Sequence, residues 1–493
     1  MKIHPAFLAF DLGAESGRLI MGELVDRKIR LNEVSRFKNQ PVRLPDGLHW
    51  DVLSLWSDII GSLKKAIQSE SVAIQSVGFD SWGVDFGLLD KKNQLIGNPF
   101  HYRDNRTDGM LEEVFKTTSR RALFSETGNQ FMQINTLFQL ASMVKTRDPA
   151  LLTAEKLLMI PDLFKFWLSG EISTEFTIAT TSQCLNPTTK KWADQLISTL
   201  GIPIEMFTAI VHPGSCIGHI TPWLCQEHDI PALSVVAPAS HDTASAVAAV
   251  PGGDRPYAWI SCGTWSIVGT NMHQPVLTED VLNLNFTNEG AAENQWRLSK
   301  IIIGLWLVQE CKRHWEANGL NLGYAELTQM ALNADPFWAV IDPDDETFLK
   351  PGNMPDRITL YCKKSGQKEP DSPGQIMRII LESMAFNYRS TIDQLEKLTR
   401  QPLDTIHIVG GGVKNQLLCQ FTANACRREC IAGPVEATAV GNIIIQAISM
   451  DFIPSIPEGR QWIKRSFEPV SFQPVDVDRW EEAYQTYKKI TGK

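Results

Sequence analysis

The chain has 493 residues, of which 43% are hydrophobic and 21% charged, and its formal net charge is −9. This length exceeds what one compact core usually holds, so two or three domains are expected. The acidic balance disfavours nucleic acid and anionic membranes as main partners. The longest uninterrupted apolar run is IIIGLWLV, at 301–308, whereas a bilayer-spanning helix needs roughly 20 such residues.

The chain opens with short apolar segments that read as strands. Residues 6–13 (AFLAFDLG), 17–24 (GRLIMGEL) and 28–37 (KIRLNEVSRF) predict an antiparallel meander, with the turn DLGAESG between its first two strands. Apolar residues spaced three or four apart predict a helix over 53–67, and 73–90 returns to strand, turn and strand. This alternation is typical of an α/β fold. The opening residues lack a signal-peptide pattern, and the nine cysteines are scattered without zinc-site spacing. Both features favour a cytoplasmic protein with reduced thiols.

A second hairpin lies about half a chain downstream. Residues 257–270 (YAWISCGTWSIVGT) again combine a strand, a turn with hydroxyl residues, and a strand. The repeated plan predicts a duplicated domain, although tight hairpin turns are common in themselves. The segment VPGGDRPYA at 250–258 is the best boundary between the two copies, because it contains two Pro and two Gly.

The segment SHDTASAV, just before this boundary, contains His241, Asp242 and Thr243 at the start of a predicted helix. Two interpretations compete. Asp is a favoured N-cap residue, and Asp242 could simply begin the helix. Alternatively, a carboxylate close to a domain boundary lies where ligands tend to bind. The positive end of the helix dipole would favour its ionised form, which can accept a proton as a general base.

Two small-residue hairpin turns could cradle phosphate through backbone N–H groups: GAESGR at 13–18 and CGTWS at 262–266. In a third small-residue turn, the strand–GGG–helix segment at 406–425, three glycines would let a flat ring lie against the backbone. The chain has neither a P-loop nor a G-x-G-x-x-G motif. Asp11, at the end of the first strand, is placed to hold Mg²⁺ through water or to cap the adjoining turn.

The order of these motifs resembles that of the FGGY carbohydrate kinases. The resemblance covers roughly residues 5 to 450 and rests on DLGAESGR, SWGVDFGLLD, YRDNRT, SHDTASAV, SCGTWS, GGGVKNQ and GPVEATAVGN. It implies a duplicated actin-like ATPase fold of RNase H-like type, with two domains around a central cleft. The sugar-binding domain would span 1–248, the nucleotide-binding domain 254–455, and a helical tail 456–493.

The resemblance also implies roles for individual residues. Asp242 would be the general base, and ATP and Mg²⁺ would be required. The sugar contacts implied are Trp82, Gly83, His241, Thr243 and Asn288. The nucleotide contacts implied are Ala14, Glu15, Ser16, Gly17, Arg18, Thr264, Gln309, Gly410, Gly411, Gly412 and Asn415.

The expected reaction is ATP-dependent phosphorylation of a 6-deoxy-L-ketohexose at O1, with L-rhamnulose as the first choice. The segments at 82–90, 102–107 and 135–140 favour this branch of the family. Ile301 departs from its pattern, which has a sugar-contacting Asn there, and an apolar side chain cannot replace the hydrogen bonds of an amide. L-Fuculose, another ketose or a polyol therefore remain alternatives, as does a non-catalytic sensor or actin-like assembly protein. The chain is expected to act as a monomer or homodimer, with no nucleic-acid or membrane partner.

Overall fold

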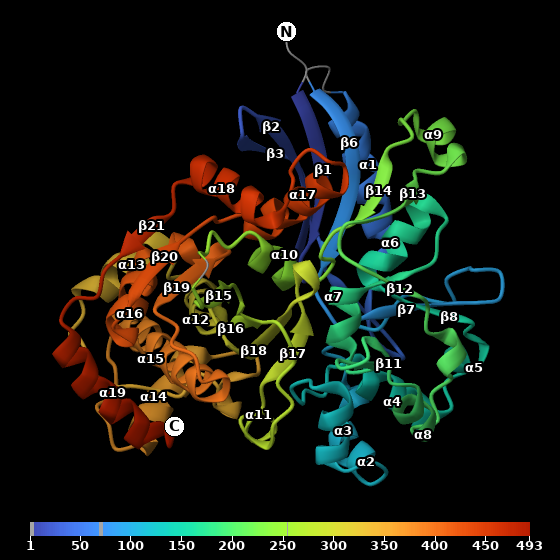
Figure 1. Ribbon diagram of the computed structural model, residues 1–493. Helices are drawn as coiled ribbons and strands as arrows, with labels where there is room; N and C mark the ends of the chain where they lie inside the picture. The colour runs from blue at the N-terminus through green and yellow to red at the C-terminus, as the bar shows by residue number, and fades with distance from the viewer. Residues whose placement is uncertain (1–3, 69–71, 254) are drawn as a thin grey trace. The chain divides into compact units, whose positions relative to one another are not determined.

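The computed structural model describes residues 4–68, 72–253 and 255–493, and the chain divides into two compact units (Figure 1). The first unit comprises the described residues up to Pro251, together with Asn271–Leu298 and Ala437–Phe467. The second comprises Gly252–Thr270, Ser299–Glu436 and Glu468–Lys493. Residues 1 and 254, where the two predicted domains begin, lie outside the described residues.

The first unit contains most of the strands. They are β1 (His4–Leu12), β2 (Ser16–Val25), β3 (Lys28–Lys38), β4 (Pro41–Leu44), β5 (Gly47–Trp50), β6 (Val72–Ser81), β7 (Phe86–Leu89), β8 (Lys156–Met159), β9 (Thr174–Glu175), β10 (Leu185–Asn186), β11 (Lys191–Trp192), β12 (Ile210–Val211), β13 (Ser215–His219), β14 (Ser234–Ala237) and β17 (Thr287–Gly290).

The helices of the first unit come from both ends of the chain. They are α1 (Val52–Ile67), α2 (Met110–Phe115), α3 (Arg120–Thr127), α4 (Thr136–Thr146), α5 (Pro149–Thr153), α6 (Ile160–Ser169), α7 (Phe176–Ala179), α8 (Asp194–Thr199), α9 (Pro222–His228), α10 (Asp242–Ala248), α11 (Glu279–Asn283), α17 (Ala437–Ser449) and α18 (Ile456–Phe467), with short 3₁₀ turns η1 (Asn105–Thr107), η2 (Thr180–Ser182), η3 (Ile204–Met206) and η4 (Ala292–Asn294).

The second unit has fewer strands and longer helices. Its elements are β15 (Ala258–Cys262), β16 (Trp265–Met272), β18 (Trp296–Ile303, which begins in the first unit), α12 (Trp306–Ala317), α13 (Tyr324–Asn333), η5 (Glu346–Phe348), α14 (Met354–Lys364), α15 (Pro373–Thr399), β19 (Thr405–Val409), η6 (Gly411–Lys414), α16 (Gln416–Cys426), β20 (Glu429–Ala432), β21 (Val470–Phe472) and α19 (Val477–Thr491).

The main sheets of the two units follow one plan. In the first, the order is β13-β14-β6-β1-β2-β3; β1 pairs antiparallel with β2 and parallel with β6, and β6 pairs parallel with β14. In the second, β15 pairs antiparallel with β16 and parallel with β19, and β19 pairs parallel with β20. An antiparallel strand ends each row, β13 beside β14 and β21 beside β20. The predicted duplication is confirmed.

The first sheet is covered on both faces. Alternate residues of β1, among them Leu8 and Phe10, join the core formed with α1 and α6, since successive side chains of a strand point to opposite faces. The helix α17 packs against β1, β6 and α10. Because β1 is buried on both sides, its sequence is apolar almost without a break.

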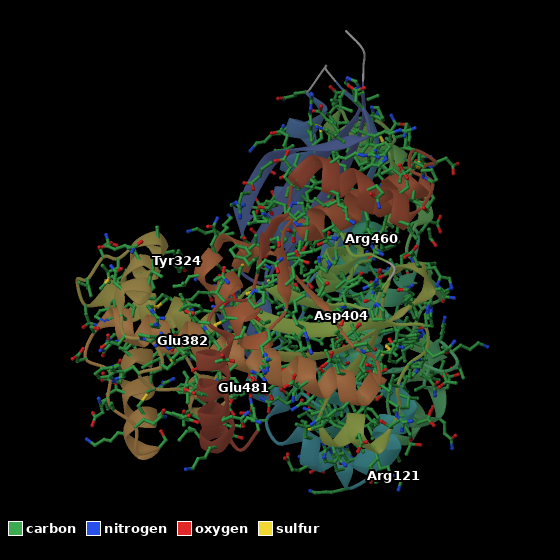
Figure 2. All side chains as sticks on the ribbon, turned by 60° about the vertical axis from the view of Figure 1, so that its left-hand side comes forward. Arg121, Tyr324, Glu382, Asp404, Arg460 and Glu481 are labelled. Atoms are coloured by element: carbon green, nitrogen blue, oxygen red, sulfur yellow. The ribbon has the colours of Figure 1, made fainter. Side chains whose placement is uncertain are left out.

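The units depart from the predicted linear bounds at the end of the chain. The segment 456–493 is not one tail: α18 packs on β3 in the first unit, whereas β21 and α19 belong to the second. In the second unit, Arg389 of α15 forms an ion pair of 2.7 Å with Glu481 of α19, which is labelled in Figure 2 with Glu382 of α15. The physical reason for the departure is that α17 and α18 bury their apolar faces against the first sheet.

The described residues include no helix that is both long enough and apolar enough to cross a bilayer.

A glycine permits the close crossing of α10 and α17. A Cβ built on Gly441 would lie 1.8 Å from the carbonyl oxygen of Ser245, far inside van der Waals contact. The residue that precedes Asn442 in the motif GPVEATAVGN is therefore fixed by packing.

We expect Gly441→Ala to destabilise the protein by at least about 1–3 kcal/mol, the usual cost of overpacking, because backbone and not a flexible side chain blocks the methyl group. Gly61→Ala in α1 is the matched control: a Cβ placed on Gly61 would have no atom within 4 Å, and Ala is favoured over Gly in a helix by about 1 kcal/mol. Urea unfolding measures both. Equal midpoints for Gly441→Ala and the wild type would contradict the close crossing.

A buried carboxylate fixes the turn after β6. Asp85 accepts hydrogen bonds from Nε1 of Trp50 (2.6 Å), Nε1 of Trp82 (3.0 Å) and Nε2 of Gln139 (2.9 Å). Burial raises the pKa of Asp85 to about 6, against the lowering effect of these donors. The folded protein therefore binds a proton here at higher pH than the unfolded chain does.

The free energy of unfolding should therefore depend on pH in the range between the unfolded and folded pKa values of Asp85. The contribution is present below the unfolded pKa of about 3.9 and is lost as pH rises through about 6. Relative to Asp85→Asn, the wild type should gain up to about 3 kcal/mol as pH falls from 7 to 4, at 1.36 kcal/mol per pKa unit.

Asp90→Asn supplies a control of opposite sign. Hydrogen bonds from the backbone N–H groups of Gln94 and Lys92 lower the pKa of Asp90, so its contribution is lost as pH falls. Unfolding free energies of the three proteins across this range test the assignment. A wild type that loses stability relative to Asp85→Asn on acidification would refute it.

Candidate active site

Three carboxylates lie at one edge of the first sheet. Asp11 ends β1 and stands opposite Asp80 in the parallel register of β1 and β6. The next residue, Ser81, forms a parallel bridge with His241, and its N–H donates to the carbonyl oxygen of Ser240 at 2.9 Å. The segment leading to Asp242 therefore lies beside the end of β6, at the edge where β1, the parallel neighbour of β6, also ends.

Asp242 is the first residue of α10, and the N-cap position belongs to His241. The interpretation of Asp242 as an N-cap is therefore wrong. Its Oδ1 accepts from the N–H (2.5 Å) and hydroxyl (3.1 Å) of the neighbouring Thr243. Its side chain is 35% exposed, and Oδ2 has no partner among the described residues. Asp242 thus presents one oxygen to an incoming molecule and is not sealed in a core.

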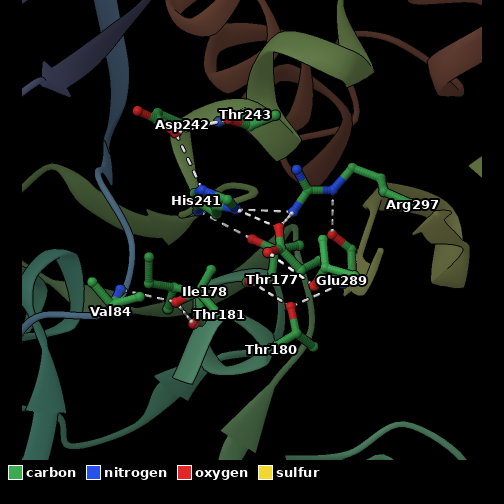
Figure 3. A network of polar contacts seen from close by, with 12 residues as sticks. Val84, Thr177, Ile178, Thr180, Thr181, His241, Asp242, Thr243, Glu289 and Arg297 are labelled. Atoms are coloured by element: carbon green, nitrogen blue, oxygen red, sulfur yellow. Dashed lines mark hydrogen bonds and ion pairs between the residues drawn. The ribbon is translucent and has the colours of Figure 1, made fainter. Parts of the chain in front are cut away.

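Behind Asp242 lies a line of buried polar side chains (Figure 3). His241 Nε2 is 3.3 Å from Asp242 Oδ1, and His241 Nδ1 is 2.9 Å from Nη2 of Arg297. Arg297 has no exposed side-chain surface, and its Nη2 is also 3.0 Å from Oε2 of Glu289. Nε of Arg297 donates to the carbonyl oxygen of Gly290 at 2.9 Å. The site thus holds a buried cation one residue removed from the exposed carboxylate.

The backbone before Asp242 is held by a second buried set of charges. Oε2 of Glu175 accepts from the N–H of Ser240 at 3.0 Å, and the Thr177 hydroxyl accepts from the N–H of His241 at 3.1 Å. Lys165 reaches the Ser240 hydroxyl at 2.9 Å and pairs with Asp162 at 2.7 Å. Buried polar contacts therefore fix both the side chain and the main chain of His241.

The electrostatic environment differs between the carboxylates. Burial raises the pKa of Glu289, but its polar neighbours, the Arg297 guanidinium among them, outweigh burial, and the net direction is downward. Burial lowers the pKa of Arg297, while Glu289 and Asp242 oppose that shift. For Asp80, burial and the adjacent Asp11 carboxylate raise the pKa well above its ordinary value. Glu289 is thus held as the anion that balances Arg297, whereas burial and a neighbouring carboxylate keep the pKa of Asp80 above its ordinary value.

The first of the turns predicted to bind phosphate lies where β1 is followed by β2. Ala14, Glu15, Ser16 and Gly17 follow Gly13, whose N–H donates to the carbonyl oxygen of Ser16 at 3.0 Å. Arg18 forms an ion pair with Asp11.

Oxygen ligands suit Mg²⁺, which commonly keeps several waters. Asp11 and Asp80 offer carboxylate oxygens on adjacent strands, and Oδ1 of the fully buried Asp80 has no hydrogen-bond partner among the described residues. Within the residues that the structure describes, no group of three or more His, Cys, Asp or Glu side chains could hold a metal ion. The residues present therefore fit a cation held partly through water.

The turn after β6 combines a buried aromatic residue with a strained backbone. Trp82 is only 6% exposed, lies in the hydrophobic core and packs on Trp50 at 4.2 Å between ring centroids. These surroundings favour a role for Trp82 in core packing over a role in stacking against a sugar. A Cβ on Gly83 would lie 3.0 Å from the side chain of Thr181. Val84, labelled in Figure 3, has φ = 68° and donates its N–H to the Thr181 hydroxyl at 3.0 Å. Such a conformation is costly for a β-branched residue and recurs at functional sites.

Asn288 was predicted to contact the sugar, but its side-chain amide makes hydrogen bonds within the first unit. Its Oδ1 accepts from the N–H of Val276 at 2.7 Å, and its Nδ2 donates to the carbonyl oxygens of Gly128 (3.1 Å) and Val276 (3.0 Å). Both amide donors are used and the residue is buried. Asn288 therefore ties two segments of the first unit together.

The other residues expected to contact the nucleotide, those outside the turn at 14–18, lie within the second unit. Gly410 and Gly412 both approach Cys262, and a Cβ on Gly412 would lie 2.2 Å from its Sγ. The carbonyl oxygen of Thr264 accepts from the N–H groups of Gly304 (3.2 Å) and Trp306 (3.1 Å), at the start of the helix that carries Gln309. Gly411 is open, since a Cβ placed there would have no atom within 4 Å. Asn415 caps α16 through the N–H of Leu418. The turns predicted separately are thus neighbours at the end of β15.

Sequence reasoning missed Arg297, Glu289, Glu175, Lys165 and Asp80. Only Asp80 could have been found from the sequence. The segment FDSW at 79–82 has the same Phe-Asp pair near the end of a predicted strand as FDLG at 10–13. The others lie in ordinary strand or helix patterns, and which buried charges meet depends on the three-dimensional fold.

Comparisons with known proteins agree with this arrangement. Residues 6–249 match the model of the FGGY family of carbohydrate kinases, N-terminal domain, and 258–450 match that of the C-terminal domain. A rhamnulokinase of Bacteroides thetaiotaomicron is 41% identical over 483 residues, covering 98% of each chain. A rhamnulokinase of Bacillus subtilis is 36% identical over 474 residues, covering 96% of each.

Solved structures share the fold at low identity. A ligand-bound xylulose kinase from Lactobacillus acidophilus superposes with a TM-score of 0.82 at 14% identity, covering 99% of this chain and 98% of that one. Plasmodium falciparum glycerol kinase with ADP gives 0.80 at 15% identity, with the same coverage. With both family models matched along nearly its whole length, the chain belongs to the FGGY family of carbohydrate kinases.

Proposed function

We propose that this carbohydrate kinase transfers the γ-phosphoryl group of MgATP to O1 of L-rhamnulose, with Asp242 as the general base. The observation that carries the base assignment is a half-exposed carboxylate with one uncommitted oxygen, held at the edge where β1 and β6 end. The choice of sugar rests on relatives of 36–41% identity over nearly the whole chain, all named rhamnulokinase.

In this reaction the protein forms no covalent bond with either substrate. As the O1–H bond of the sugar breaks, Oδ2 of Asp242 takes the proton and the oxygen attacks the γ-phosphorus; the bond to the bridging oxygen breaks and ADP leaves. Positioning and charge neutralisation supply most of the catalysis in such transfers. Mg²⁺ bound to the nucleotide would supply charge neutralisation, and Asp11 would hold it through water.

The remaining predicted contacts fall into two groups in this proposal. Gly83, His241 and Thr243 stay with the sugar, together with the backbone of the strained turn at Val84. The turn at 14–18 and the second-unit residues Thr264, Gln309, Gly410, Gly411, Gly412 and Asn415 stay with the nucleotide. Asn288 is no longer included, and Trp82 supports the turn from within the core.

The expected cell compartment rests on the state of the cysteines and on the proposed phosphoryl donor. All nine cysteines are free, as in proteins kept reduced, and the proposed phosphoryl donor is ATP. We therefore retain the cytoplasm as the expected location, and a monomer or homodimer as the expected assembly.

A coupled assay for ADP release across L-rhamnulose, L-fuculose, D-xylulose, L-ribulose and glycerol tests the substrate. We expect the highest kcat/KM for L-rhamnulose, with L-fuculose next because it differs only in configuration at C4. Since Ile301 stands where an Asn sugar contact was expected, L-fuculose is the most informative competitor. A higher kcat/KM for glycerol or a pentulose would overturn the choice of sugar while leaving the kinase assignment intact.

Asp242→Asn tests the base. It should lower kcat by about 10²–10⁴-fold, the usual worth of a general base, with sugar affinity nearly unchanged by calorimetry, because Asn keeps the shape but cannot take the proton. Asp229→Asn, an exposed residue after α9 in the same unit, is the matched control and should retain wild-type kcat. Full activity of Asp242→Asn would remove it from the mechanism.

A further inference from the structure

We propose that Arg297 is a positioning residue for the base: it fixes His241 in the neutral form that carries its hydrogen on Nε2, and His241 thereby holds Asp242. The inference deepens the proposed function, since it rests on Asp242 acting as the base.

The hydrogen bond between Arg297 and His241 can run in only one direction. Nη2 of Arg297 lies 2.9 Å from Nδ1 of His241. A guanidinium group has donors only, so Nδ1 must be the acceptor and carries no hydrogen. In a neutral imidazole the hydrogen then sits on Nε2, because the bond made by one ring nitrogen decides the state of the other.

The other ring nitrogen of His241 faces the base. Nε2 lies 3.3 Å from Oδ1 of Asp242, so a hydrogen on Nε2 would lie next to a carboxylate oxygen. That oxygen already accepts from the N–H and hydroxyl of Thr243. The two Thr243 donors, with Nε2 of His241 beside them at 3.3 Å, hold the carboxylate in one orientation and leave Oδ2 to take the sugar's proton. The opposite tautomer would place a nitrogen lone pair against the carboxylate.

Glu289 makes the choice of tautomer depend on Arg297. Oε2 of Glu289 lies 3.4 Å from the same Nδ1 and would accept a hydrogen there if Arg297 were absent. His241 would then stand between two carboxylates, Glu289 and Asp242, and Nδ1 would gain a hydrogen. Arg297 prevents this by occupying Nδ1 and by pairing with Glu289 at 3.0 Å.

The other charged groups near this line act on its surroundings. Glu175 and Lys165, with Asp162, hold the main chain of residues 240 and 241 and contact no atom of the imidazole ring among the interactions described. Asp80, with Asp11 and Arg18, lies on the β1 and β6 side of Asp242. Loss of Arg297 should therefore change the state of the ring while the loop that carries it stays anchored.

The test reads the tautomer directly. Protein labelled with ¹⁵N in its histidines is examined by long-range ¹H–¹⁵N correlation in mildly alkaline buffer without substrate, and His241→Gln identifies the signal. We expect wild-type His241 to show a hydrogen on Nε2 and none on Nδ1. A hydrogen on Nδ1 of the wild type would overturn the proposal, whatever sugar the enzyme uses, since no substrate is present.

Variants test the part played by Arg297. Arg297→Met should put a hydrogen on Nδ1 and lower kcat roughly 10- to 100-fold, the range seen when a group that orients a functional ligand is removed, with a smaller change in sugar KM. The double variant Arg297→Met/Glu289→Gln leaves no unpaired buried charge, and the new amide N–H can donate to Nδ1. It should return the hydrogen to Nε2 and recover most of kcat.

Two results would contradict this role. The first is an Arg297→Met protein that folds and keeps the wild-type tautomer and kcat. The second is a hydrogen on Nδ1 of wild-type His241, which decides the matter even where the single variant fails to fold because Glu289 is left buried without its partner.

Discussion

The parallel pairing of β6 with β1 on one side and β14 on the other determines where chemistry can occur in the first unit. Parallel neighbours end at the same edge, so Asp11, Asp80 and the Ser240–Asp242 segment converge although they are far apart in sequence. A shift of one residue in the register of β6 would turn Asp80 to the other face of the sheet. The buried apolar residues of β1 and β6, which face α1 and α6, fix that register and hence the site.

Holding a half-exposed carboxylate at this edge requires buried charge. Burying a lone guanidinium or carboxylate is costly, and removing one partner of a buried pair is strongly destabilising. Arg297 with Glu289, and Lys165 with Asp162, meet this condition by pairing within hydrogen-bond distance. Arg297 contacts the ring of His241, and Lys165 contacts the hydroxyl of the preceding residue, Ser240. Stability and catalytic geometry in this region therefore depend on the same contacts.

Much of this organisation could be predicted from the sequence. The hairpins at 6–24 and 257–270, the helix at 53–67 and the duplicated plan follow from short-range apolar patterns, which report local structure reliably. Asp242 was identifiable because the motif SHDTASAV stands just before a Pro/Gly boundary. The position of α17 and α18 was not, since a continuous sequence does not show that a late segment packs back onto the first sheet.

The errors at single residues have a common physical cause. His241 and not Asp242 occupies the N-cap position, a one-residue difference that only backbone dihedral angles resolve. Asn288 fits the profile of a polar sugar contact, but its amide is used up by Gly128 and Val276. Side-chain roles of this kind depend on which partners the fold brings within about 3 Å.

The proton of the sugar hydroxyl that becomes phosphorylated should pass to Asp242. A crystal structure of the chain with L-rhamnulose and a non-hydrolysable ATP analogue tests this transfer most directly. We expect Oδ2 of Asp242 within about 2.6–3.2 Å of the O1 hydroxyl, with O1 facing the terminal phosphorus. A bound sugar whose O1 points away from Asp242, with another side chain at that distance, would contradict the assignment.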